Sequence, residues 1–493
     1  MLNFSPSSVL ADGGFIFGKY SEQTGLNEIA YCMNVTSESN SDPTERLVPF
    51  TRHEFGEDFC WGTVTAAFQI EGAVRSGGRG ASIWDVFSHK KGKIKNGHHA
   101  DVACDFYNRY EADLEMVAEM GFSEFRFSLS WSRILPTGTG EINPEGVDFY
   151  NQVIDKCVSL GIKPWVTLYH WDLPQALEVQ GGWKNRKIIN WFAEYATLCA
   201  TLFGDRVKNW IVLNEPMAVA ALGYTTGLHA PGKKGLWNFL PVVHHLAMCQ
   251  AEGGRILRDL VPDAYIGTAI SCSFIEPFTN DLKDLRAAQR ADAVMNRLFI
   301  EPALGLGYPI DAFAYLGGIK KYMQAGDAER LRFDFDFIGL QNYFGVTVKH
   351  SYLAPVLWLK EVPAKLRNVP VTAMGWEVKP DGVYNILCQF AQYKGIKEII
   401  VSESGAAYHD LVENGEVHDK ERAAYFALYL EQVLRAKREG INIKGYLVWS
   451  LMDNFEWAEG YNARFGLVHV DFETQKRTIK TSGKWFARLL KNE

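Results

Sequence analysis

The sequence predicts an α/β protein built as a single (β/α)8 TIM barrel with long βα loops. Three observations lead to this prediction. Short apolar runs rich in branched residues alternate with helical patterns from Phe55 onward, eight such runs occur, and several of them end in polar side chains. Runs of this kind are typical of fully buried parallel strands. Eight strands that alternate with helices fit one closed barrel better than an open sheet.

The predicted elements follow one another in regular order. The strands are expected at residues 59–64, 124–131, 163–171, 209–216, 265–270, 337–342, 398–405 and 443–451. Helices are expected at residues 107–120, 147–160 and 188–203. In the first of these, Leu114, Val117 and Met120 recur at helical spacing. Gly161 is expected to end the second helix. The sequence contains no internal repeat and no sign of a second domain.

The first 50 residues differ from the rest of the chain. Residues 1–50 are predicted to form a flexible N-terminal extension, and residues 51–493 the barrel domain. The segment 35–44 is polar and rich in turn-forming residues, without periodicity. The first residues lack the basic and apolar regions of a signal peptide. No run approaches the ~18 apolar residues of a membrane helix.

Composition and charge exclude several classes of partner. The net charge of −7 argues against a nucleic acid or an anionic membrane. None of the 8 Cys residues forms a CxxC pair, so zinc and redox motifs are unsupported. Most of them lie in apolar surroundings, so we expect free buried thiols in a reducing compartment. Since a signal peptide and a membrane helix are also not indicated, we expect a cytoplasmic protein. No metal or organic cofactor is expected, and the adjacent His98 and His99 are expected to be solvated. The sequence leaves the oligomeric state open.

Two of the predicted strands carry a glutamate to their C-terminal ends. The run 209–216 ends in Asn214, Glu215 and Pro216, and the run 398–405 delivers Glu403 in the same way. The C-terminal end of the strands is the catalytic face of such a barrel. Two carboxyl groups on that face suit the hydrolysis of an acetal at a sugar. One protonates the leaving oxygen while the other attacks or stabilises the anomeric carbon.

Further polar or aromatic residues stand at the same ends of other strands. A buried strand has no packing reason to end in such residues, and a set of this size is hard to explain as loop capping alone. They are Gln69, Arg126, His170, Asn214, Asn342 and Trp449.

Five motifs give the chain a family resemblance. They are residues 59–72, residues 126–134 (RFSLSWSRI), residues 170–174 (HWDLP), residues 213–216 (LNEP) and residues 453–457 (DNFEW). With these motifs in order, the chain resembles the family one glycoside hydrolases, the β-glucosidase and β-galactosidase group. The resemblance runs from about Phe55 to the C-terminus.

The resemblance implies a retaining β-glucosidase that acts through a covalent glycosyl-enzyme. It implies Glu215 as the acid/base, Glu403 as the nucleophile and Arg126 as the group that orients Glu403. The implied substrates are small-molecule β-glycosides or cello-oligosaccharides from cellulose degradation, cleaved at the terminal non-reducing β-D-glucosyl residue. β-Galactosides and β-fucosides are further candidates.

The resemblance also implies a set of substrate-binding residues. They are Gln69, His170, Asn214, Asn342, Phe344, Trp376, Trp449, Glu456, Trp457 and Phe465. Gln69, His170 and Asn214 resemble residues that bind sugar hydroxyls, with Asn214 toward the 2-hydroxyl. Glu456 resembles the reader of the 4- and 6-hydroxyls, Trp457 of the 3-hydroxyl, and Trp449 the platform under the ring. Phe465 resembles the wall near C6 and Trp376 the leaving-group platform. Trp131 and Trp171 are interpreted as core residues.

One departure from the family pattern bears on the nucleophile. The family usually has Asn-Tyr-Tyr after the sixth strand, with the second tyrosine donating to the nucleophile, and this chain has Asn342, Tyr343 and Phe344. If no other group replaces that hydroxyl, we expect Glu403 to lose one hydrogen bond and its pKa to lie somewhat higher. In the family's Thr-Glu-Asn-Gly motif, Ser404 replaces the asparagine.

Two alternatives stay open at this point. A 6-phospho-β-glycosidase is disfavoured because the Glu456 carboxylate would repel the phosphate. A non-catalytic sugar-binding pseudoenzyme is disfavoured because both glutamates are present, although Phe344 keeps that alternative in view.

Overall fold

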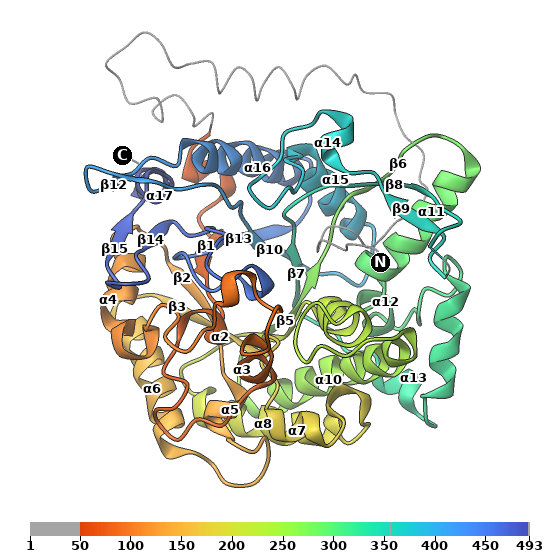
Figure 1. Ribbon diagram of the computed structural model, residues 1–493, viewed down its shortest axis with the longest axis horizontal. Helices are drawn as coiled ribbons and strands as arrows, with labels where there is room; N and C mark the ends of the chain where they lie inside the picture. The colour runs from red at the N-terminus through yellow and green to blue at the C-terminus, as the bar shows by residue number, and fades with distance from the viewer. Residues whose placement is uncertain (1–49, 355, 492–493) are drawn as a thin grey trace.

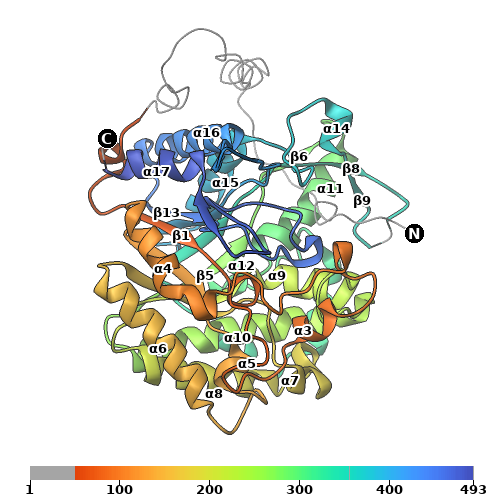
Figure 2. The ribbon, with the colours of Figure 1, turned by 60° about the vertical axis from the view of Figure 1, so that its left-hand side comes forward.

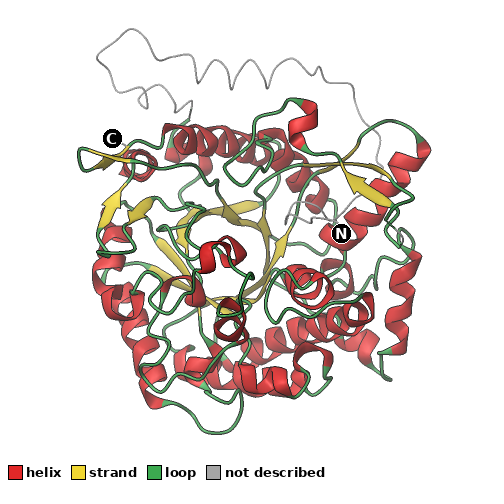
Figure 3. Ribbon diagram, in the orientation of Figure 1, coloured by secondary structure: helices red, strands yellow, loops and turns green. Residues whose placement is uncertain are grey.

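The computed structural model describes residues 50–354 and 356–491. Its centre is a closed barrel of eight parallel strands, each hydrogen-bonded to the strands before and after it in the barrel. The strands are β1 (Cys60–Val64), β2 (Glu124–Ser128), β3 (Lys163–Tyr169), β4 (Asn209–Asn214), β5 (Tyr265–Ser271), β7 (Phe337–Gln341), β10 (Ile399–Ser404) and β13 (Ile443–Trp449). Figure 3 shows them as a yellow ring inside a ring of red helices. The predicted fold is confirmed.

Helices surround the barrel, as the views in Figures 1 and 2 show together. The longer ones are α4 (Phe106–Glu119), α6 (Pro144–Ser159), α8 (Ile188–Phe203), α10 (Phe239–Leu260), α11 (Leu282–Asp292), α15 (Pro380–Ala391), α16 (Lys420–Arg438) and α17 (Thr481–Lys491). The predicted helix 188–203 is confirmed to the residue. The helix predicted at 147–160 begins earlier, at Pro144, because proline fits the first turn of a helix. Gly161 follows this helix with φ 73°, as a terminating glycine does.

Short helices and small sheets lie in the loops that connect the longer elements. The short helices are α2 (Ala67–Ile70), α3 (Ile83–Ser88), α5 (Trp131–Ile134), α7 (Gln175–Val179), α9 (Pro216–Ala218), α12 (Ile300–Ala303), α13 (Asp327–Arg330) and α14 (Ala364–Arg367). Small sheets outside the barrel comprise β6 (Ile275–Pro277), β8 (Val346–His350) and β9 (Leu359–Glu361), then β11 (Val412–Glu413) with β12 (Glu416–Val417), then β14 (Val468–Val470) with β15 (Arg477–Ile479).

Six of the eight strands stop earlier at their C-terminal ends than the sequence predicted, whereas β1 ends at Val64 as predicted and β5 runs one residue further, to Ser271. The strand predicted to reach Trp131 ends at Ser128, and the strand predicted to reach Trp171 ends at Tyr169. Trp171 has φ 77° and Glu215 has φ 43°, a left-handed backbone that cannot continue a strand. The chain therefore turns sharply at Glu215 and directly after His170, at the ends of the strands that carry these polar side chains.

Two apolar cores lie on either side of the strands. The larger one fills the space between barrel and helices. The smaller one fills the barrel interior with side chains such as Trp165, Ile211 and Phe337, and reaches Trp449 and Phe465 at the C-terminal end. The barrel is therefore a packed core and not a pore.

The predicted N-terminal extension lies outside the described residues except for Phe50. That residue is buried and packs edge-on against Phe55, with ring centroids 5.5 Å apart. Within the described part of the chain, Cys60, Cys104, Cys157, Cys199, Cys249, Cys272 and Cys388 are free thiols. None of the described helices is long and apolar enough to cross a lipid bilayer.

Candidate active site

The two glutamates stand at the same end of the barrel, on strands separated by β5 and β7. Glu403 is the last residue but one of β10 and is almost fully buried. Glu215 directly follows β4, where its N–H donates to the Ala269 carbonyl at 2.9 Å. A non-glycine residue with positive φ is uncommon and strained. At Glu215 this conformation interrupts the alternation of side chains between the two faces of β4, at the C-terminal end of the barrel.

Arg126 connects the two strand ends. Its Nη1 donates to Glu403 Oε1 at 2.6 Å, and its Nη2 donates to Asn214 Oδ1 at 2.5 Å. Its Nε donates to the Thr167 hydroxyl at 3.0 Å on the neighbouring strand. Arg126 is 1% exposed, so its ion pair with Glu403 is shielded from solvent. Loss of either partner would leave a buried charge without its counter-ion. One planar group therefore fixes Glu403 relative to the residue that precedes Glu215.

A tyrosine does donate to Glu403, and the expectation that this hydrogen bond is lost is wrong. The Tyr343 hydroxyl donates to Glu403 Oε2 at 2.6 Å. Phe344 instead packs on Trp376, with ring centroids 4.9 Å apart. Consecutive residues after β7 point in different directions, and the first aromatic of the pair is the one that faces the carboxylate. Each Glu403 oxygen therefore has its own donor.

The hydrogen bonds of Asn214 fix the tautomer of His170. Arg126 Nη2 and Gln341 Nε2 are donors only, so the Asn214 atom that faces both, at 2.5 and 2.6 Å, is Oδ1. The Asn214 amide nitrogen then donates to His170 Nε2 at 3.0 Å, and His170 carries its proton on Nδ1. Burial and the nearby Arg126 charge hold the pKa of His170 well below its ordinary value. His170 is therefore a neutral imidazole with a free N–H donor.

Burial shapes the ionisation of three carboxyl groups. Burial and the Glu403 charge raise the pKa of Glu215 to about 8, and the same two causes raise the pKa of Glu456 to about 8. Burial also raises the pKa of Glu403, but the Arg126 charge and the Tyr343 hydrogen bond oppose that effect. Glu403 is therefore the carboxyl that the site stabilises as an anion, while Glu215 keeps its proton near neutral pH.

Gln69 and the segment after β13 form one polar wall. Gln69 follows β1 on α2, and its Nε2 donates to Asn454 Oδ1 and the Phe455 carbonyl at 2.9 Å each and to Glu456 Oε2 at 3.3 Å. Its Oε1 is buried without a hydrogen-bond partner. A buried acceptor and the Glu456 carboxyl thus lie side by side, which suits a ligand rich in hydroxyl groups.

Aromatic rings form two groups beside the polar wall. Trp457 lies against His170 at 5.9 Å and Trp171 at 4.6 Å between ring centroids, and Trp449 lies 6.1 Å from His170. In the second group Trp376 lies 5.8 Å from Phe465, and Tyr343 contacts both. Apolar ring faces next to hydrogen-bonding groups complement a sugar, because the rings can contact its C–H face while the polar groups bind its hydroxyls.

The core interpretation holds for Trp131, which is fully buried and stacks on Tyr195. Trp171 is also buried, but it links the core to the site, since its indole N–H donates to the Asn214 carbonyl at 3.0 Å.

Sequence reasoning missed several residues of the site. Gln341 donates to Asn214 Oδ1 and Tyr343 donates to Glu403 Oε2, while a hydrogen bond from the Ser271 side chain lowers the pKa of Glu215. The position of Gln341 and Ser271 at the ends of β7 and β5 was a usable signal. Asn342 was placed in the sugar site, yet its side chain donates to the Cys272 carbonyl at 3.0 Å and its backbone N–H to the Glu403 carbonyl. Its contact with a substrate stays a prediction.

Known proteins resemble the chain along almost its whole described length. The family model described as "Glycosyl hydrolase family 1" matches residues 51–493. The 1,4-beta-D-glucan glucohydrolase of Thermotoga neapolitana is 44% identical over 441 residues, covering 89% of this chain and 98% of its own. Beta-glucosidase A of Thermotoga maritima is also 44% identical over 441 residues, with the same coverage. The solved structure titled "Beta-glucosidase from Thermotoga maritima in complex with glucoimidazole" matches with a TM-score of 0.85 at 44% identity, covering 89% of this chain and 99% of that one.

Proposed function

The chain belongs to glycosyl hydrolase family 1, and from that membership and the site geometry we propose that it is a retaining β-glucosidase. It hydrolyses terminal non-reducing β-D-glucosyl residues. The observation that carries this proposal is the pair of carboxyl groups with opposite surroundings at one end of the barrel. Glu403 has an arginine and a tyrosine hydroxyl as donors, whereas burial and the Glu403 charge keep Glu215 protonated.

These surroundings suit a double displacement. Glu215 gives its proton to the glycosidic oxygen while a Glu403 oxygen attacks the anomeric carbon, so the bond to the aglycone breaks and an ester to Glu403 forms. The esterified Glu403 is no longer charged, and the pKa of Glu215 falls. Glu215 can then take a proton from water, which attacks the anomeric carbon and releases Glu403 with retained configuration.

The neighbouring residues suit recognition of a glucosyl unit. We assign hydroxyl recognition to Gln69, His170, Asn214 and Glu456, ring contact to Trp449 and Trp457, the wall near C6 to Phe465, and the leaving-group platform to Trp376. The neutral His170 N–H is a donor, Gln69 Oε1 is an acceptor, and the Glu456 carboxyl can donate and accept while it is protonated. A hydroxyl can serve both kinds of partner because it donates and accepts.

The alternatives lose support for specific reasons. The Glu456 carboxyl stands where a 6-phosphate would need cations, and neither its protonated nor its ionised form supplies a positive charge to bind that phosphate. The doubt about a non-catalytic relative rested on a missing tyrosine hydroxyl, and Tyr343 supplies that hydroxyl.

Some finer features are also proposals. The name of the Thermotoga neapolitana relative, 1,4-beta-D-glucan glucohydrolase, supports cello-oligosaccharides as substrates. Cellulose degradation as the source of these substrates, and β-galactosides and β-fucosides as further substrates, are part of the same proposal. Free buried thiols such as Cys157 and Cys199 support a reducing compartment, the cytoplasm.

Trapping of the intermediate tests the proposed function directly. A 2-deoxy-2-fluoro-β-glucoside with a good leaving group should inactivate the protein and add one fluoroglucosyl group per chain. Peptide mapping by mass spectrometry should find that group on Glu403. A label on another residue, or turnover without any label, would refute the assignment of the nucleophile.

The pH dependence of kcat/KM should be bell-shaped, with an alkaline limb near pH 8. Glu215 must be protonated to act as the acid, so activity falls as pH rises through its pKa of about 8. Glu403 must be ionised, so activity also falls as pH drops through its raised pKa. The profile is measured with an aryl glucoside at substrate concentrations well below KM. An alkaline limb that persists unchanged in Glu215→Gln would contradict the assignment of the acid.

Replacing Tyr343 by phenylalanine should lower kcat/KM by roughly 10- to 100-fold. The change removes a hydrogen bond to a charged group, worth ~1.5–3 kcal/mol. Because the lost donor favoured the anion, the acid limb of the pH profile should move to higher pH. The matched control is Tyr425→Phe, which removes a buried hydroxyl that bonds to the Tyr343 carbonyl and not to Glu403. Equal effects of the two changes on the acid limb would contradict the proposed role.

A further inference from the structure

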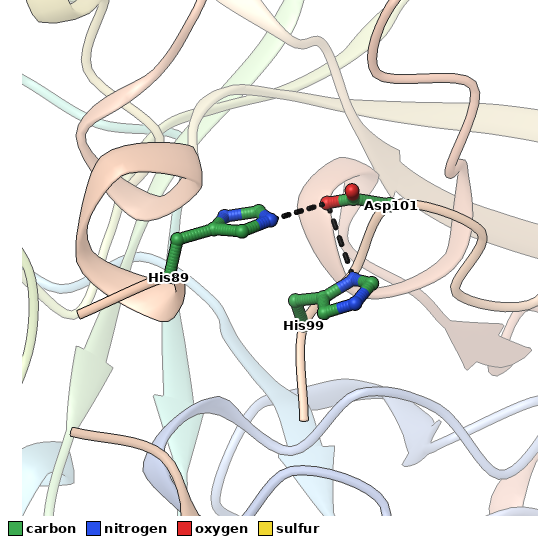
Figure 4. A group of neighbouring side chains, drawn as sticks. All are labelled: His89, His99 and Asp101. Carbon is green, nitrogen blue, oxygen red and sulfur yellow. Dashed lines mark ion pairs between the residues drawn. The ribbon is translucent and has the colours of Figure 1, made fainter. Parts of the chain in front are cut away.

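Two histidines and an aspartate meet outside the candidate active site, in the loop between α3 and α4 (Figure 4). His89 Nε2 lies 3.4 Å from Asp101 Oδ1, and His99 Nδ1 lies 3.3 Å from the same oxygen. The three ligand atoms all lie within 4.8 Å of one another. Figure 4 shows one nitrogen of each ring turned toward the same Asp101 oxygen. Sequence reasoning treated His99 as solvated and did not connect it with His89.

The ring of His89 is held with one nitrogen turned toward this group. Its Nδ1 lies 2.8 Å from the Asp85 carbonyl, an acceptor only, so Nδ1 carries the proton in that bond. In the neutral ring the lone pair is then on Nε2, which faces the Asp101 oxygen. Histidines that bind metals usually have this arrangement, with the second nitrogen donating to a backbone carbonyl or a carboxylate. Two facing lone pairs are better accommodated by a cation than by each other.

We propose that His89, His99 and Asp101 bind a zinc ion. With Zn–N and Zn–O distances of ~2.0–2.1 Å, neighbouring ligands of a tetrahedral site lie about 3.3 Å apart. Two of the three separations already have this length. The third, between the two rings, is no longer than 4.8 Å and closes by rotation of the His99 side chain, which is 48% exposed. Imidazole and carboxylate ligands suit zinc, and water completes the coordination.

The charge around the site permits a divalent cation. The ligands supply two imidazoles and one carboxylate. Lysines at positions 90, 91, 93 and 95 are nearby in the sequence, but Lys95 is paired with Glu459 and the Lys93 ammonium lies over the Phe87 ring. Repulsion from the remaining exposed lysines is screened at physiological ionic strength.

The site connects two segments that support the loop after β13. The His99 carbonyl accepts from the Tyr461 hydroxyl at 2.9 Å, and His98 Nδ1 accepts from the Tyr461 N–H at 3.0 Å. On the other side, His89 ends α3, whose Trp84 packs on Trp457 at 4.5 Å. Zinc would therefore tie α3 to the segment that holds Tyr461. From this position, zinc would have a structural role and stabilise the segment proposed to bind the sugar. Zinc binding itself does not depend on the proposed function.

Zinc titration of the chelator-treated protein tests the proposal. Isothermal titration with zinc chloride alone, at physiological salt, should show one saturable site, and zinc should raise the melting temperature. The changes His89→Gln, His99→Gln and Asp101→Asn should each weaken binding by more than ~10-fold, because loss of a residue that only supports a metal ligand already costs ~10- to 100-fold. Each variant should also lose the zinc-dependent rise in melting temperature.

His418→Gln is the matched control. His418 is also 48% exposed and lies 3.7 Å from the Glu416 carboxylate, but it has no third ligand in the described part of the chain. This variant should bind zinc as the unchanged protein does. Cobalt bound to the unchanged protein should give visible absorption bands of a four-coordinate site, a reading that needs no variant. No saturable binding, no such bands, or equal binding in all four variants would overturn the proposal.

Discussion

Replacing Glu403 by glutamine should reduce turnover of β-glucosides by about 10^4- to 10^6-fold. Removal of the nucleophile of an enzyme that forms a covalent intermediate costs on this order. Glutamine keeps the shape of the side chain but cannot form the ester to the anomeric carbon. The loss should appear in kcat with every leaving group, because both steps of the reaction pass through this carboxylate. Steady-state rates with a series of aryl glucosides measure it.

Two controls separate loss of chemistry from loss of fold. Glu403→Gln leaves the buried Arg126 without its counter-ion. The melting temperature of the variant should therefore fall, while its circular dichroism spectrum stays native. In Glu403→Gly the removed side chain leaves space for a small anion. Added formate or azide should then restore activity toward a substrate with a good leaving group. Turnover by Glu403→Gln at the rate of the unchanged protein would refute the assignment of Glu403 as the nucleophile.

Replacing Glu215 by alanine should have an effect that depends on the leaving group. General acid catalysis contributes about 10^2- to 10^4-fold, and the contribution is needed most when the leaving alcohol is a poor one. Hydrolysis of cellobiose should fall by that amount or more. Formation of the glycosyl-enzyme from a dinitrophenyl glucoside should hardly change, because that group leaves without a proton. Its overall turnover should then be limited by slow attack of water.

Azide provides the decisive measurement for Glu215→Ala. An anionic nucleophile needs no base, so azide should accelerate breakdown of the accumulated intermediate and give a β-glucosyl azide. The product should have the β configuration because two displacements have occurred. The unchanged protein should respond little to azide, since its own Glu215 carboxylate repels the anion. An α-glucosyl azide, or equal losses with both leaving groups, would contradict the role of acid and base.

Much of this protein could be predicted from local patterns. The eight strands are short apolar runs, and their order along the chain allowed only a few topologies. Glu215 and Glu403 could be found because each ends such a run, where a buried strand gives no reason for a carboxyl group. Helix 188–203 was predicted to the residue because its apolar positions and the glycine after it agree. The strands at Trp171 and Glu215 were predicted too long because the chain adopts a left-handed backbone at both residues, although Pro216 already marks the end of the second of these strands.

The environment of the carboxyl groups could not be predicted in the same way. Family pattern alone suggested that Phe344 had displaced the tyrosine of the nucleophile, whereas Tyr343 makes that hydrogen bond. The choice between two adjacent rings depends on how the chain leaves β7 and on Trp376, which Phe344 packs against. Likewise, the proton on His170 Nδ1 follows from donors on β2 and β7 that act through Asn214.

The sequence by itself determined the barrel and the identity of its two glutamates, because strand periodicity and strand ends are properties of neighbouring residues. Only the tertiary structure decided which donors face Glu403, why Glu215 holds its proton, and that His89 meets His99 and Asp101. Those features depend on side chains far apart in the chain and on the water excluded between them. Hydrogen bonding and burial of this kind exist only once the barrel has closed.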